Sequence, residues 1–247
     1  MTERGQGSLD RGPQHLRIGP SRMVMQDDRL VIDFSETALP WPGQRLKPGR
    51  VSGRVELVAD IASTHSVDLD QEGRHVWCPR MPRARATITC DALPGGGWRG
   101  PAYHDMNFGN RPIEQDFIGW DWARGLCGAR GDTIILYDAT LRSGTPRRLA
   151  LRYSGQAAPE VIGLPPRQPL PRGFWGVRSG VACDAAGTPQ LLTRLEDSPF
   201  YTRACIETSL QGQRLVMVHE TLDCRRLSHP LVRLMLPFRM PRRGRYP

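Results

Sequence analysis

The stretch DTIILYDATLRSGTPRRLALRYS, residues 132–154, contains the pattern that decides the fold. Leu149, Leu151 and Tyr153 occupy alternate positions, so one face of an extended chain enters a core while the other face meets solvent. Residues 143–146 separate this run from the apolar run before it, and their sequence, Ser-Gly-Thr-Pro, is typical of a tight turn. The stretch therefore predicts a β-hairpin.

The same combination of short alternating runs and turn residues recurs along the chain. Leu30, Ile32 and Phe34 form another alternating run, and turns are indicated at 185–188 and 211–213. We predict strands at 14–19, 29–35, 51–59, 84–90, 99–104, 117–124, 132–140, 147–154, 174–183, 190–196, 202–210 and 214–222. Only 229–236 has a helical pattern. Many short antiparallel strands with little helix predict an all-β protein, either barrel or sandwich.

Two segments rich in Pro and Gly interrupt the strand pattern. Residues 91–101 are suited to joining two domains, and residues 163–173 are suited to a packed loop or a semi-rigid spacer. A length of 247 residues is compatible with one large domain or two small ones.

The chain is strongly basic, with a formal net charge of +9. Such a charge can indicate a nucleic-acid partner, but Lys47 is the only lysine and most arginines are scattered singly along predicted strands, so we predict no nucleic-acid partner. After Asp223 there is no acidic residue, and arginines flank the apolar run 231–238. This tail is either a surface that rests on anionic lipid or a solvated basic end.

The cysteines and the N-terminus bear on the compartment. The six cysteines form no C-x-x-C pair, the first residues have no apolar signal-peptide core, and no run of 18 apolar residues is present. We therefore expect reduced thiols, a cytoplasmic location and, if the chain meets a membrane, peripheral contact.

Aromatic residues surround one acidic residue in the sequence. Tyr103 and Asp105 are two positions apart on a predicted strand, so they share a face, which Asn107 continues. The pairs His75 with Trp77, and Trp120 with Trp122, have the same spacing. A carboxyl group placed among aromatic rings away from water can stay neutral, and a neutral acid beside π-faces is suited to carbocation chemistry.

Each of these features also has a structural explanation. Aromatic residues at alternate strand positions commonly pack a core, His75 alone is commonly structural, and Asp105 near Gly109 can form an Asx turn. A zinc site from His75, His104 and Asp105 would need side chains from opposite faces of one strand. The chain has no G-x-S-x-G elbow, no P-loop and no dinucleotide fingerprint.

Several ordered segments resemble the acyclic carotenoid 1,2-hydratases, also called hydroxyneurosporene synthases. The matching segments are GRHVWCP at 73–79, YHDMNFGNRP at 103–112, FIGWDWARG at 117–125, LEDSPFYTR at 195–203, VHETL at 218–222 and VRLMLPFRMPRR at 232–243. The resemblance implies a lipocalin-like double β-domain. Residues 1–98 would be the remainder of the first β-domain, and residues 99–247 would be the second, with a basic C-terminal tail. Typical members carry a further segment ahead of Met1, so we expect the first domain to lack its first strands and activity to depend on them.

The resemblance also implies an activity. It is the addition of water across the terminal C1=C2 bond of an acyclic carotenoid such as neurosporene or lycopene, in carotenoid biosynthesis, without a redox or metal cofactor. Asp105 would protonate the alkene, and His75 would hold the water and take its proton, or orient Asp105. Trp77 and Tyr103 would face the cation. The expected substrate-binding residues are Trp120, Trp122, Asn107 and Phe108.

Two alternatives stay open on the sequence. The chain can be a non-catalytic carrier of a hydrophobic polyene, or a related cyclase or isomerase that uses the same kind of cation. Within the first reading, the expected partners are the carotenoid, water and the lipid of the inner photosynthetic membrane, which the protein would approach from the cytoplasm. The sequence predicts no oligomeric state.

Overall fold

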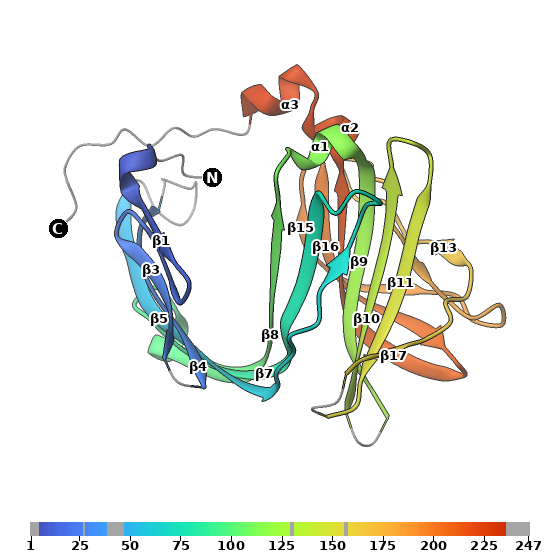
Figure 1. The fold of residues 1–247 in the computed structure, drawn as a ribbon, viewed down its shortest axis with the longest axis horizontal. Helices are drawn as coiled ribbons and strands as arrows, with labels where there is room; N and C mark the ends of the chain where they lie inside the picture. The colour runs from blue at the N-terminus through green and yellow to red at the C-terminus, as the bar shows by residue number, and fades with distance from the viewer. Residues whose placement is uncertain (1–4, 27, 39–46, 129–130, 156–157, 236–247) are drawn as a thin grey trace. The chain divides into compact units, whose positions relative to one another are not determined.

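The computed structural model describes residues 5–26, 28–38, 47–128, 131–155 and 158–235. The described chain is almost entirely antiparallel β-sheet, as the sequence predicts (Figure 1). The hairpin predicted at 132–154 is present, and its turn is closed by hydrogen bonds from Gly144 N to Leu141 O (2.9 Å) and from Leu141 N to Thr145 O (3.1 Å). The prediction of an all-β fold is confirmed.

One sheet has eight strands in the order β1-β2-β3-β4-β5-β7-β6, with β8 pairing with β7. Their bounds are β1 Leu9–Gly12, β2 His15–Ile18, β3 Ser21–Gln26, β4 Arg29–Ala38, β5 Gly49–Ile61, β6 Val67–Asp68, β7 His75–Cys90 and β8 Gly97–Gly109. The strand predicted at 84–90 is longer than expected, because β7 begins at His75. His75 and Trp77 therefore lie on a strand at alternate positions.

The second sheet has seven strands in the order β12-β11-β10-β9-β17-β16-β15. Their bounds are β9 Phe117–Cys127, β10 Asp132–Leu141, β11 Pro146–Tyr153, β12 Glu160–Val161, β15 Gln190–Asp197, β16 Tyr201–Leu210 and β17 Gln213–Asp223. A two-stranded sheet of β13 (Arg167–Pro169) and β14 (Gly180–Ala182) covers part of one face, where it contacts β9 and β16. Apolar residues from these strands, among them Leu136, Val181 and Met217, form a buried core cluster on that face.

The register of the second sheet places two tryptophans and a tyrosine on the opposite face. Trp122 lies directly across from Tyr137 and Trp120 from Ala139, so Trp120, Trp122 and Tyr137 share one face. Asp121 lies between the tryptophans and faces the core side. This alternation separates the aromatic face from a polar cluster on the other side of β9.

Some predicted elements differ from the observed ones. The strand predicted at 174–183 is wrong for its first part, because only Gly180–Ala182 forms β14. The helical pattern at 229–236 corresponds to α3, Pro230–Met235, but two further one-turn helices, α1 Ile113–Asp116 and α2 Cys224–Leu227, escape the pattern because four residues are too few to show a helical period. Two 3₁₀ turns, η1 Gln6–Ser8 and η2 Pro94–Gly96, complete the described elements.

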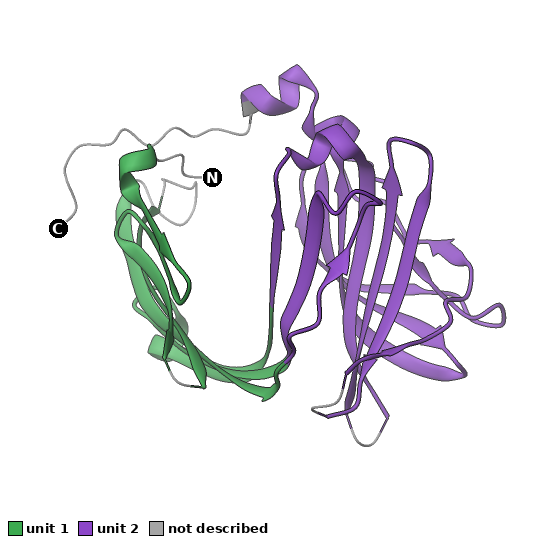
Figure 2. Cartoon of the chain, in the orientation of Figure 1, with its two compact units in different colours: residues 1–62, 83–104, 237–247 green, residues 63–82, 105–236 purple. Residues whose placement is uncertain are grey.

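The chain divides into two compact units, drawn in different colours in Figure 2. Unit 1 contains residues 1–62, 83–104 and 237–247, and unit 2 contains residues 63–82 and 105–236. Each unit is made of segments that are discontinuous in the sequence, so no single boundary separates the two units. A domain boundary between residues 98 and 99 stays a prediction. Most of the predicted basic tail, residues 236–247, lies outside the described residues.

Candidate active site

A buried indole holds the acid that the sequence singles out. Trp77 on β7 is fully buried, and its Nε1 donates a hydrogen bond to Oδ2 of Asp105 on β8 at 2.8 Å. Asp105 itself is half-buried. Both residues belong to unit 2, although 28 positions separate them in the sequence. The hydrogen bond fixes the orientation of the carboxyl group against an aromatic ring.

The indole begins a series of aromatic contacts that we call the aromatic row, formed by Trp77, Tyr137, Trp120, Phe117 and His75. Ring centroids along the row are 5.3 Å apart for Trp77 and Tyr137, 6.3 Å for Tyr137 and Trp120, 5.9 Å for Trp120 and Phe117, and 5.0 Å for Phe117 and His75. These separations are typical of favourable aromatic pairs. The row therefore connects the Asp105 end of the site to the His75 end.

Tyr137 contributes an uncharged phenol to the aromatic row. Burial raises the pKa of its phenol, and the nearby charges of Asp105 and then Cys224 raise it further. An ionised carboxylate and an ionised phenol close together in a buried place would repel each other. Tyr137 thus stays protonated and contributes its ring face without introducing a negative charge.

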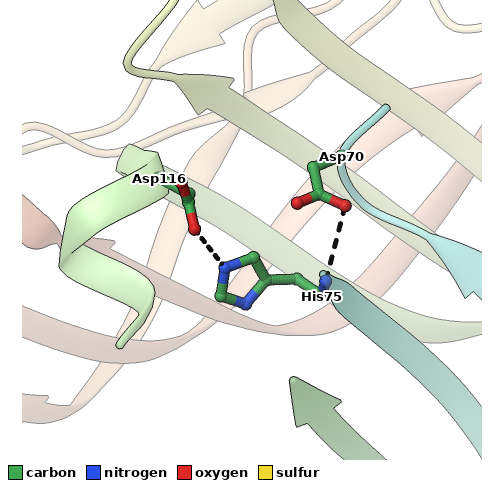
Figure 3. Close-up of side chains that lie close together, drawn as sticks. All are labelled: Asp70, His75 and Asp116. Carbon is green, nitrogen blue, oxygen red and sulfur yellow. Dashed lines mark hydrogen bonds and ion pairs between the residues drawn. The ribbon is translucent and has the colours of Figure 1, made fainter. Parts of the chain in front are cut away.

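His75 has an acidic partner at the other end of the row (Figure 3). Its Nε2 lies 2.8 Å from Oδ2 of Asp116, and both side chains are largely buried. Arg74 and Arg111 flank the same carboxylate, with guanidinium nitrogens at 3.3 and 3.4 Å. A carboxylate oxygen at this distance accepts the hydrogen on Nε2, and in the neutral imidazole that leaves the lone pair on Nδ1.

Asp70 holds the backbone at this end of the strand. Its Oδ1 accepts the backbone N–H of Arg74 at 2.8 Å. It also accepts the N–H of His75, the first residue of β7, at 3.4 Å (Figure 3). The imidazole also has little space around it, because a Cβ added to Gly109 would meet Nδ1 of His75 at 3.0 Å and Arg74 O at 2.5 Å. His75 is therefore held by the hydrogen bond at its backbone N–H, by the bond at Nε2 and by the close approach of Gly109 to Nδ1.

The three groups Asp70, His75 and Asp116 are close enough to bind one cation, since a ligand atom of each lies within 4.8 Å of the others. Asp116, however, is already bonded to His75 and paired with two arginines, so a cation would have to displace guanidinium groups. The donor set fits a hydrogen-bond network better than a metal centre. His104, considered for a zinc site with His75 and Asp105, falls in unit 1.

The structure brings only some of the predicted site residues together. Asp105 and Trp77 are in contact, and Trp120 and His75 join them through the aromatic row. Trp122 is buried on the same face as Trp120.

The remaining predicted residues lie along β8. Tyr103 shares that strand with Asp105 at two positions' distance, is half-buried, and is assigned to unit 1. Asn107 and Phe108 are exposed at the end of the strand, with Phe108 48% accessible. Their roles in binding substrate stay predictions.

Four residues of the site are absent from the predicted set. Tyr137 and Phe117 join the row through strand pairing, and Asp70 and Asp116 hold His75 through contacts that span up to 41 positions. The alternating pattern of residues 132–140 places Tyr137 in the middle of a predicted strand, but nothing in the local sequence marks it as a neighbour of Trp77. Asp116 lies in a one-turn helix that no periodicity reveals.

A second buried polar cluster lies on the core side of β9 in unit 2. Asp121 Oδ1 accepts the hydroxyl of Thr221 at 2.6 Å and the backbone N–H of Gly180 at 3.2 Å, while Oδ2 accepts Nε of Arg167 at 2.8 Å. His219 Nε2 donates to Gly180 O at 3.0 Å, and burial lowers the pKa of this imidazole. The cluster ties β13 and β14 to β9 and β17, which is a structural role.

The cysteines carry no disulfide. All six are free, and five of them are buried. Burial raises the pKa of Cys78, and that of Cys224 to about 12, so these two thiols are poor nucleophiles at neutral pH.

The chain is thus an all-β protein that holds a carboxyl group beside buried aromatic rings. Comparison with known proteins identifies the family: the family described as Carotenoid hydratase CrtC matches residues 1–247, and the chain belongs to it. A relative from Thiocapsa roseopersicina, named acyclic carotenoid 1,2-hydratase, is 39% identical over 245 residues, which are 99% of this chain and 58% of that protein. A relative of the same name from Cereibacter sphaeroides is 36% identical over 243 residues, covering 98% of this chain and 84% of that protein.

The coverage of the relatives differs. The chain spans 58% of the length of the relatives from Thiocapsa roseopersicina and Rubrivivax gelatinosus. Among solved structures, kievitone hydratase from Nectria haematococca aligns with 85% of this chain and 83% of its own, at 10% identity and a TM-score of 0.45. That likeness is too low to carry a functional argument.

Proposed function

We propose that this chain carries the active site of an acyclic carotenoid 1,2-hydratase, a hydro-lyase that adds water to the C1=C2 bond of an acyclic carotenoid. The observation that carries the proposal is the hydrogen bond from the buried indole of Trp77 to Asp105 at the end of the aromatic row. The names of the relatives, which span the whole of this chain, supply the reaction class. Neurosporene and lycopene are the substrates we expect.

The first step is proton transfer to carbon. Asp105 gives its proton to C2, the C=C π electrons form the new C–H bond, and a tertiary cation is left at C1. The indole N–H of Trp77 holds this carboxyl group through Oδ2. A general acid must be positioned at the reacting carbon, and the hydrogen bond from Trp77 supplies that positioning.

The cation is then stabilised without a competing nucleophile. The faces of Trp77, Tyr137 and Trp120 lie in the row beside Asp105, and a desolvated ring face stabilises a cation by about 2 kcal/mol. Tyr103 extends this set if its side chain shares the face of Asp105, as strand alternation indicates. The buried cysteine thiols stay protonated and do not capture the cation.

Water completes the reaction at C1. Its oxygen bonds to the cation, and the proton that it loses passes to the lone pair on Nδ1 of His75 and finally restores Asp105. Asp116 is a positioning residue in this scheme, because its bond to Nε2 selects the imidazole tautomer that has a basic Nδ1. Asp105 and His75 return to their starting protonation states after one turnover.

The substrate suggests where the enzyme works. Within the described residues, no helix has the length and hydropathy to cross a bilayer. A carotenoid is dissolved in lipid, so we further propose peripheral association with the cytoplasmic side of the inner photosynthetic membrane. The oligomeric state does not enter the scheme.

The experiment that tests the proposal is conversion of lycopene or neurosporene in detergent micelles, followed by mass spectrometry of the product. The expected product has gained one water, and Asp105→Asn abolishes its formation while Asp132→Asn, at the start of β10 in the same unit, does not. Binding of the carotenoid without any product would favour a carrier. A product of unchanged mass would favour a cyclase or isomerase.

A further inference from the structure

A turn in unit 2 presents two aromatic side chains to solvent. We call residues 171–178, with the sequence PRGFWGVR, the aromatic turn. Phe174 is 90% accessible, Trp175 is also exposed, and their rings meet edge to face at 5.4 Å. Exposed aromatic pairs of this kind commonly mark interaction sites.

The backbone of the aromatic turn is held firmly, so the exposure of its rings is built into the fold. Arg194 Nη2 donates to Pro171 O at 2.8 Å, and Arg226 Nη1 donates to Trp175 O at 2.6 Å. Asp197 Oδ2 accepts the backbone N–H of Trp175 at 3.4 Å. A binding tip that is already ordered loses little conformational entropy when it meets a partner.

A polar cleft of about 520 Å³ lies in the same unit and includes one end of the aromatic turn. Arg167, Arg178, Arg225 and Arg226 contribute to its wall. Two of these arginines are neutralised, because Arg167 pairs with Asp121 at 2.6 Å and Arg226 with Asp223 at 3.4 Å.

The cleft wall also contains Asp138, which pairs with Arg148 at 2.8 Å, so the other two arginines give the cleft an excess of positive charge. Among the described residues, Arg178 and Arg225 form no ion pair with an acidic side chain. The segment 161–183 contains three arginines and no acidic residue, and Arg172 in the turn is exposed. Guanidinium groups bind phosphate with two parallel hydrogen bonds, so the cleft is suited to a phosphate group.

Apolar residues continue beside the cleft. Arg225 belongs to α2, which contacts α3, and Leu231 and Leu234 on α3 are exposed. Exposed Phe, Trp and Leu next to arginines are the composition of segments that lie in a membrane interface.

We infer that the aromatic turn and the arginine cleft form a docking site for an anionic phospholipid surface. The phosphate of a headgroup lies between Arg178 and Arg225, and Phe174 and Trp175 enter the boundary between headgroups and acyl chains. The inference rests on the proposed function in one respect: a substrate dissolved in lipid gives the protein a reason to approach a membrane. The anchored exposed rings and the uncompensated charge carry the rest, and none of the residues in the site comes from 236–247.

The test is sedimentation of the full chain with lipid vesicles that contain no carotenoid, so its outcome is independent of hydration. Vesicles of phosphatidylcholine alone are compared with vesicles that also contain phosphatidylglycerol. We expect strong preference for the anionic vesicles. Phe174→Ser with Trp175→Ser lowers the partition coefficient by more than about tenfold, and Arg178→Gln with Arg225→Gln lowers it by about fivefold for each arginine.

Matched controls separate these effects from general changes in apolarity or charge. Val161→Ser alters another exposed apolar residue, 69% accessible, and Arg147→Gln removes an exposed arginine on β11. Both controls bind as the unaltered chain does, and both double variants still hydrate carotenoid in detergent.

Three results would overturn the inference. The double variants bind anionic vesicles as strongly as the unaltered chain, which assigns binding to other basic segments. Inorganic phosphate binds the cleft and, at saturation, leaves vesicle binding as it is in chloride of equal ionic strength, which assigns the cleft to free phosphate. The Phe174 and Trp175 variant turns a dimer into a monomer without changing vesicle binding, which assigns the aromatic turn to a second copy of the chain.

Discussion

Replacing Trp77 with phenylalanine isolates the hydrogen bond on which the candidate site depends. In the unaltered protein the ring centroids of Trp77 and Tyr137 are 5.3 Å apart, and the indole Nε1 lies 2.8 Å from Oδ2 of Asp105. Phenylalanine keeps an aromatic ring against Tyr137 but removes the N–H that Asp105 accepts. A hydrogen bond to a charged or strongly polarised carboxyl group contributes about 1.5–3 kcal/mol. If that energy positions the acid for proton transfer, its loss lowers kcat by about 10- to 150-fold.

The same change has a separate cost in stability. Trp77 is fully buried, so the smaller ring leaves space in the interior and lowers the free energy of unfolding by roughly 1–3 kcal/mol. Urea unfolding measures that loss, and steady-state hydration of lycopene in micelles measures kcat and KM. Trp98→Phe, at a half-exposed tryptophan of unit 1, is the control. A Trp77→Phe enzyme with unaltered kcat would refute the reasoning, because the carboxyl group would then need no indole partner.

Three further predictions concern His75 and the buried polar cluster around Asp121. Asp116→Asn removes the anion that selects the imidazole tautomer, so we expect kcat to fall by more than about tenfold with little change in KM and with an altered pH profile, measured by steady-state kinetics. An unaltered pH profile would show that Asp116 is only structural. Gly109→Ala places a Cβ 2.5 Å from Arg74 O and 3.0 Å from Nδ1 of His75, so we expect activity to fall and the melting temperature to drop by a few degrees. Gly163→Ala is the control, because a Cβ there meets no atom within 4 Å and changes neither property. His219→Gln removes the buried imidazole. Burial lowers the pKa of His219 in the folded protein below its ordinary 6.5, so the unfolded chain takes up the proton first as the pH falls. The free energy of unfolding therefore decreases below pH 6.5. Urea unfolding between neutral and mildly acidic pH measures this loss, whose slope reaches about 1.4 kcal/mol for each pH unit, and the variant flattens it. An equal slope in the variant would assign the acid sensitivity to other groups.

Most of the longer strands were predictable because each of them carries its own signal, although the six-residue β3, Ser21–Gln26, was missed. Alternating apolar residues and turn chemistry mark β10, β11, β16 and β17 within one or two residues of their observed bounds. The short strands and one-turn helices were not predictable, since two to four residues contain less than one period of any pattern. Residues 174–178 of the aromatic turn were expected to be strand. Backbone contacts from Arg194 and Arg226 hold the turn instead, and those contacts come from distant positions.

The site was predictable where it repeats a local spacing. His75 with Trp77, and Trp120 with Trp122, lie at alternate strand positions, and strand geometry places each pair on one face. Which faces meet is a property of the sheet register, so Tyr137 became visible only through its pairing with Trp122. The partners of His75 depend on a loop and a one-turn helix that bring Asp70 and Asp116 to the strand, and no spacing in the sequence encodes that meeting.

The origin of the hydrogen at C2 of the product tests the central claim most directly. Hydration of lycopene in D₂O, followed by exchange of the hydroxyl group in ordinary water, is predicted to leave one carbon-bound deuterium at C2, with no product from the Asp105→Asn variant. A hydrated product without deuterium at C2, or one formed at an undiminished rate by Asp105→Asn, would contradict protonation of the alkene by Asp105.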